Sequence, residues 1–134
     1  MANEAQIRNY PKSYMAQDYT CGEVSMEKGT LLKLSGARGV YPTSADNDAF
    51  AGVLARETIA GSGRTQAAVY EKGCGAVFDM YCDAVGPAIA AGNDVCISGA
   101  NIIKKYTTLD DEAGYVVGKA LEPNTAVGYM QVQI

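Results

Sequence analysis

Apolar and polar positions alternate along short stretches of this chain and do not follow a helical period. Leu32 and Leu34 flank a lysine in one such stretch, and Val95 and Ile97 flank a cysteine in another. Alternation at every second residue is the pattern of a strand with one buried face. The runs recur at regular spacing between Gly, Pro and polar clusters. The sequence therefore predicts an all-β fold, either a small β-sandwich or a small barrel.

The expected strands cover most of the chain after residue 27, and one of them contains Val95 and Ile97. The others are expected at Thr30–Leu34, Val40–Tyr41, Phe50–Arg56, Thr65–Tyr70, Ala76–Tyr81, Tyr115–Leu121 and Tyr129–Ile134.

An internal repeat organises these strands. Lys28–Ala37 and Ala91–Ala100 each contain a glycine at the second position, an alternating centre and a final Ser-Gly-Ala. The correspondence continues downstream, where Gly39–Tyr41 matches Ile102–Lys104, Phe50–Leu54 matches Val116–Ala120, and Ala67–Tyr70 matches Met130–Gln133. The second copy has a longer first loop and a shorter last loop. We therefore expect a single β domain at 28–134, built from two related modules at 28–71 and 91–134.

Residues 1–27 have a different character, and two interpretations remain open for them. One is a tail followed by an edge strand near Tyr19–Val24. The other is an extended arm, ending in that edge strand, that lies on a neighbouring protein. A proline disfavours helix at the residue before it, and tyrosine offers a large contact area at a small entropy cost. We favour the arm, whose candidate partner-binding residues are Ile7, Tyr10, Pro11, Tyr14, Met15 and Tyr19.

Composition and charge narrow the classes of partner. The chain has 134 residues, is 48% hydrophobic and 19% charged, and carries a net charge of −4. Its Lys and Arg residues are dispersed, whereas nucleic-acid binding requires clustered cations, so we expect no nucleic-acid partner. No apolar run approaches the roughly 20 residues of a membrane span, so we expect no membrane contact either.

The residues needed for catalysis are scarce. The chain has no His, and its four Cys, at 21, 74, 82 and 96, form no C-x-x-C pair. Histidine is the commonest general base near neutral pH, and zinc sites use paired Cys and His ligands. We therefore expect no catalytic residue, metal or cofactor, and we do not expect an enzyme.

Three weaker signals have simpler explanations. Gly61–Thr65 has the glycines of a phosphate loop but lacks its lysine and precedes an expected strand, so we interpret it as a hairpin tip. Asp46–Asp48 and Asp110–Glu112 do not have the spacing of a calcium loop and are expected to be solvated. Lys104 and Lys105 leave open a carrier domain of the lipoyl or biotinyl type, although the acidic or Met residues expected beside a modified lysine are missing.

The order of segments in the second module resembles the capsid cement, or head decoration, proteins of tailed bacteriophages. The resemblance rests on Gly-Asn-Asp-Val-Cys-Ile-Ser-Gly-Ala at 92–100, Gly-Tyr-Val-Val-Gly-Lys-Ala-Leu-Glu at 114–122 and the strand that follows. A weaker version occupies the first module, so about 28–134 is covered. Asn93-Asp94 stands where the family usually has a single Asp, and the tyrosine-rich arm is less typical.

The resemblance implies a structural protein on the outer surface of an icosahedral virion, added to a head assembled in the host cytoplasm. Its partner would be the major capsid protein, and its oligomeric state a homotrimer at threefold positions. Many weak contacts made together would stabilise the shell through avidity. The alternatives are a structural protein of a phage tail or baseplate, and the carrier domain.

Overall fold

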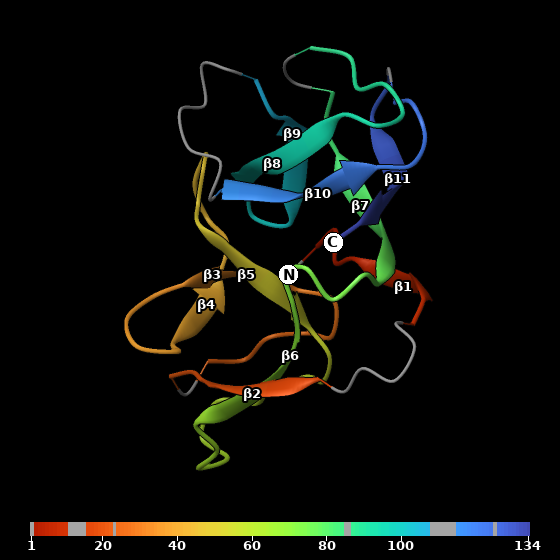
Figure 1. Ribbon diagram of the computed structural model, residues 1–134. Coiled ribbons are helices and arrows are strands. Elements are labelled where there is room, and N and C mark those ends of the chain that lie inside the picture. Colours follow the sequence, from red (N-terminus) through yellow and green to blue (C-terminus); the bar gives the residue numbers. More distant parts are fainter. Residues whose placement is uncertain (1, 11–15, 23, 85–86, 108–114, 125) are drawn as a thin grey trace.

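A computed structural model describes residues 2–10, 16–22, 24–84, 87–107, 115–124 and 126–134 (Figure 1). The fold is all-β, as the alternating pattern predicts. In the described residues the strands are β1 (Gln6–Asn9), β2 (Gln17–Thr20), β3 (Leu31–Leu34), β4 (Val40–Pro42), β5 (Phe50–Leu54), β6 (Gln66–Glu71), β7 (Val77–Cys82), β8 (Asp94–Gly99), β9 (Ile102–Lys105), β10 (Val116–Ala120) and β11 (Gly128–Gln133).

Two sheets with the same strand order make up the protein. The first sheet has the order β2-β6-β5-β3-β4, and the second has the order β7-β11-β10-β8-β9 with β1 added beside β7. A parallel pairing of β7 with β9 closes the second sheet into a barrel. At the corresponding place in the first sheet, a single parallel bridge joins Thr20 to Gly39. We call β2–β6 the first module and β7–β11 the second module; they fill the lower and upper halves of Figure 1.

The correspondence extends to individual hydrogen bonds. The N–H of Gly29 donates to the carbonyl of Leu54 at 2.9 Å, and the N–H of Gly92 donates to the carbonyl of Ala120 at 2.8 Å. Both glycines have a positive φ, at 92° and 89°. Because β2 and β7 occupy equivalent places, the repeating unit of the structure begins one strand before residues 28 and 91.

Both modules also contain a β-bulge at the same position. The pairing of β5 with β3 shifts register between Phe50 and Gly52, and the pairing of β10 with β8 shifts between Val116 and Gly118. A bulge sharpens the twist of a strand and helps a small sheet to curl. Directly after each bulge comes a glycine, where the neighbouring strand crosses so closely that a side chain has no room.

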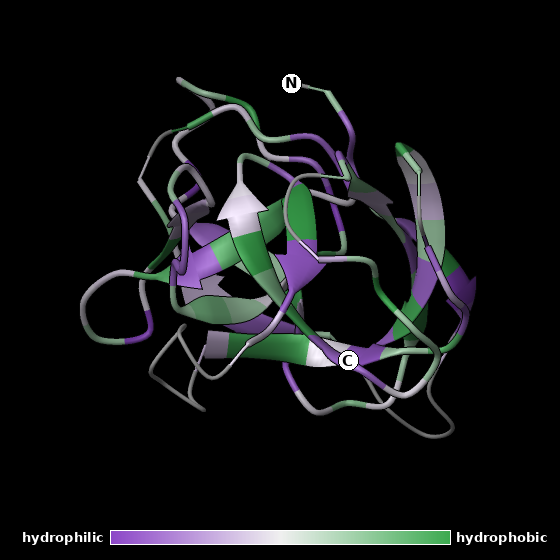
Figure 2. Cartoon of the chain, turned by 90° about the horizontal axis from the view of Figure 1, so that it is seen from above, coloured by the Kyte–Doolittle hydropathy of each residue, from purple (hydrophilic) through white to green (hydrophobic). Residues whose placement is uncertain are grey.

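Two hydrophobic cores hold the modules, and they share strand β5. In Figure 2, hydrophobic stretches in the strands are interrupted or ended by hydrophilic residues. The core of the first module includes Leu32, Leu54 and Val69. The core of the second module also contains Phe50 and Val53, so β5 is buried along its whole length and joins the two modules.

A buried asparagine adds a polar connection between the modules. Asn101 is 1% exposed and has a φ of 58° in the turn between β8 and β9. Its side-chain oxygen accepts the N–H of Leu31 at 2.8 Å, and its own N–H donates to the hydroxyl of Thr43 at 3.1 Å. Its amide nitrogen donates to the carbonyl of Ala2 at 3.0 Å. One side chain thus ties the second module to the first and to the N-terminal segment.

Candidate functional site

The N-terminal segment around Ile7 belongs to the folded protein. We expected Ile7 to anchor an extended arm on a neighbouring protein, but β1 pairs antiparallel with β7, where Gln6 lies opposite Asp79 and Ile7 opposite Phe78. Ile7 packs against the core of the second module, and Arg8 forms an ion pair with Asp79 at 2.7 Å. The interpretation of residues 6–9 as an arm on a neighbouring protein is therefore corrected. The edge of β7 leaves backbone groups that β1 can satisfy.

Tyr19 is also buried, at 9% exposure, and cannot act as an anchor on a partner surface. It lies in β2, which forms an edge of the first sheet. Its hydroxyl donates a hydrogen bond to the carboxylate of Glu71, and the guanidinium of Arg38 stands 4.4 Å from its ring centre. Burial and then the Glu71 carboxylate raise the pKa of the Tyr19 hydroxyl. The polar neighbours of Tyr19 in the sequence led us to expect an exposed ring. They do not show which way β2 faces, and in the structure β2 turns the ring inward.

Of the predicted anchors that the structure describes, Tyr10 is the one whose side chain is mostly exposed. It is 63% exposed, and its ring meets the ring of Tyr70 edge to face with 6.2 Å between centroids. Tyr70 in turn packs against Phe78, at 5.9 Å. Tyr10 is thus held on a rigid aromatic base. Pro11, Tyr14 and Met15 lie outside the described residues.

Two of the thiols and one of the lysines considered for chemistry lie in surroundings that do not favour reactivity. Burial raises the pKa of the Cys21 thiol, and burial is also the main factor that raises the pKa of Cys74, which disfavours the reactive thiolate. Lys104 lies in β9 and forms an ion pair with Asp46 at 2.6 Å. Within the described ranges, no group of three or more His, Cys, Asp or Glu side chains is arranged to hold a metal ion.

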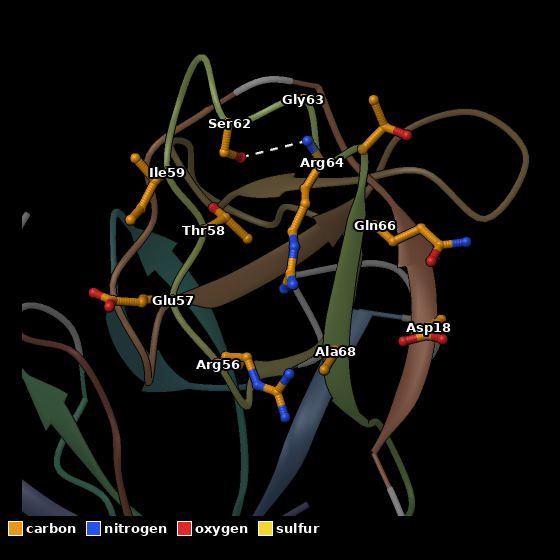
Figure 3. Close-up of a pocket in the computed structure, with 11 residues that line it drawn as sticks. Asp18, Arg56, Glu57, Thr58, Ile59, Ser62, Gly63, Arg64, Gln66 and Ala68 are labelled. Carbon is orange, nitrogen blue, oxygen red and sulfur yellow. Dashed lines mark hydrogen bonds between the residues drawn. The ribbon is translucent and has the colours of Figure 1, made fainter.

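A hollow of about 760 Å³ opens on the first module, between the loop that joins β5 to β6 and the strands β6 and β2 (Figure 3). Asp18, Gln66 and Ala68 line its strand side. The remaining lining residues come from the loop, namely Arg56, Glu57, Thr58, Ile59, Ser62, Gly63, Arg64 and Thr65. The guanidinium groups of Arg56 and Arg64 lie inside the hollow, whereas the carboxylate of Glu57 points away from it (Figure 3).

The sequence indicated the loop but not its arginines. The segment Gly61–Thr65 does form a hairpin connection between β5 and β6. Arg56 and Arg64 stand eight positions apart, so they do not form a charge cluster along the chain. The signal that could have pointed to Arg64 is the difference in loop length between the two repeats, because Arg64 lies in the longer copy of this loop.

In the part of the chain that the structure covers, no helix has the length and apolar character needed to cross a membrane. No protein-family model matches the chain, and no curated protein matches it.

Proposed function

We propose that this protein binds the outer surface of an icosahedral viral head as a cement protein and stabilises contacts between major capsid subunits. The observation that carries the proposal is the tandem repeat: one chain presents two modules with the same strand order and with a parallel contact at the same place. A protein with two similar surfaces suits a partner that is itself a repeating array, since simultaneous weak contacts multiply in effect. A homotrimer would extend this multiplication at threefold positions.

The segments behind the resemblance to cement proteins support the proposal because they lie together. Residues 92–100 include β8, residues 114–122 include β10, and the following strand is β11. These three strands are consecutive neighbours in the second sheet. The recurring pattern therefore corresponds to one continuous piece of the barrel and not to scattered matches.

Tyr10 is the contact residue on which we base the test. An exposed tyrosine on a rigid aromatic base gives contact area with little further loss of entropy, which is typical of interface hot spots. Deleting residues 2–15 would also remove β1 and expose the edge of β7, so a point substitution is the cleaner probe.

The experiment is co-sedimentation of the purified protein with undecorated shells of its own virus. We expect saturable binding by the native chain, and about tenfold or greater weakening by Tyr10→Ser with an unchanged unfolding midpoint. Tyr129→Ser is the matched control, since Tyr129 is 46% exposed on the second module. Failure of the native chain to bind shells would refute the head assignment, and sedimentation with purified tails would then test the tail alternative. Sedimentation equilibrium of the free protein tests the homotrimer.

A further inference from the structure

The two modules differ most clearly, among the described residues, in how their last two strands are connected. Eleven residues, 55–65, join β5 to β6, whereas seven residues, 121–127, join β10 to β11. Strand order, bulge position and closing contact are otherwise the same in both modules. The shorter connection joins the equivalent strands of the second module, so the first module carries four additional residues at this place. Such additions to a rigid scaffold are where binding residues gather.

Hydrogen bonds fix the first part of the longer loop to the first module. Met26 and Thr58 exchange backbone hydrogen bonds at 3.0 and 2.9 Å, and Ile89 and Asn124 do the same in the second module. The hydroxyl of Thr58 also donates to the carbonyl of Val24 at 2.6 Å, and the N–H of Ala60 donates to the hydroxyl of Ser25 at 3.0 Å. The extra length therefore falls after Thr58. It forms a tip that stands beside β6 and encloses the hollow of Figure 3.

Several other cations in the described residues form an ion pair with an acidic side chain, whereas the arginines in this hollow do not. Arg8 pairs with Asp79, Lys104 with Asp46, and Lys119 with Asp94. Within the described residues, the guanidinium groups of Arg56 and Arg64 form neither an ion pair nor a hydrogen bond; the bond at Arg64 is made by its backbone N–H to Ser62. The chain has 15 acidic and 11 basic residues, so partners of opposite charge are not scarce.

We propose that this hollow binds the carboxylate side chains of an extended acidic segment of a partner protein. A guanidinium group presents N–H donors in a planar fork that matches a carboxylate, and two such groups at one hollow can each hold a side chain. The inference concerns the chemistry of the hollow and does not depend on the shell being the partner.

A nucleic acid fits the hollow less well than an acidic peptide. Asp18 lines the hollow on its strand side, where its carboxylate would repel a continuous row of phosphates. Nucleic-acid affinity also arises from neutralising many phosphates at once, and the hollow offers two arginines. An acidic segment can instead place individual carboxylates at the guanidinium groups and leave other positions neutral.

The test is a titration of the isotopically labelled protein with a capped hexapeptide of alternating Glu and Gly, followed by the backbone amide signals of residues 55–68. We expect these signals to shift saturably, and the affinity to fall when NaCl rises from about 50 to about 300 mM because screening shortens the range of the attraction. Arg56→Gln with Arg64→Gln should weaken binding about tenfold or more. Arg8→Gln with Lys28→Gln removes two charges elsewhere and should leave the affinity unchanged.

A second variant separates loss of the site from loss of folding. Gln66 lines the hollow and is exposed, so Gln66→Glu keeps the shape and adds a negative charge to the lining. This variant should fold normally and bind the same Glu-Gly peptide at least about tenfold more weakly. Three results would overturn the proposal: no shift of these signals in the native protein, equal affinity in the double arginine variant, or tighter binding of an oligothymidylate than of the peptide.

Discussion

At the scale of single residues, one glycine in each module lies where the neighbouring strand approaches most closely. A Cβ at Gly52 would lie 2.2 Å from the carbonyl oxygen of Tyr70, and a Cβ at Gly118 would lie 2.2 Å from that of Gln133. These carbonyls belong to β6 and β11, which occupy equivalent places in the two modules. Neither glycine is needed for a left-handed backbone, so the close approach of the neighbouring strand is what excludes a side chain.

Gly118→Ala therefore should lower the free energy of unfolding by about 1–3 kcal/mol, because β10 and β11 must separate to admit the methyl group. Gly99→Ala is the matched control, since a Cβ there meets nothing within 4 Å. We expect the control to change stability by less than about 0.5 kcal/mol in urea denaturation. Equal effects of the two substitutions would contradict the packing explanation.

At the scale of elements, the turn between β4 and β5 is organised by one carboxylate. The backbone N–H groups of Ser44 and Ala45 donate to Asp48 at 2.8 and 3.0 Å, and the ammonium of Lys33 lies 3.5 Å from the same oxygen. Desolvation alone would raise the pKa of Asp48, but the two hydrogen bonds and Lys33 together outweigh it and lower the pKa below its usual range.

A carboxyl group with a lowered pKa stabilises the folded state above its unfolded pKa, and this contribution is lost as the pH falls through the folded pKa. Asp48→Asn should therefore cost about 1–2 kcal/mol at pH 7. The difference from the native protein should shrink as the pH falls from about 5 to about 2, the range in which carboxylates titrate. Urea titrations across this range provide the measurement, and a constant difference would refute the role of the charge.

At the scale of the whole molecule, the modules share a core and should unfold together. Phe50 and Val53 of the first module are buried in the core of the second, and Asn101 of the second binds the backbone of Leu31 in the first. Asn101→Gly keeps a backbone that tolerates the positive φ but removes the amide, leaving the buried N–H of Leu31 without its acceptor.

We expect Asn101→Gly to lower the free energy of unfolding by about 1–3 kcal/mol, the usual cost of an unsatisfied buried donor. Ala84→Gly is the control, because Ala84 is exposed and has a φ of 61° without such an amide. Circular dichroism and amide exchange should report one cooperative transition for both modules. Two separate transitions in the native protein would show that the shared core does not couple them.

Local sequence was sufficient for most strands after residue 27 and for the internal repeat, because alternation and turn glycines act between neighbouring residues. Val95, Ile97 and Gly118 lie in strands, as their patterns predicted. The tertiary structure alone decided that β1 completes the edge of β7, that Tyr19 turns inward and that Arg56 and Arg64 share one hollow. These outcomes depend on contacts between segments that are distant in the sequence, and on which strand edge has no partner. Neither produces a periodic pattern of apolar residues along the chain.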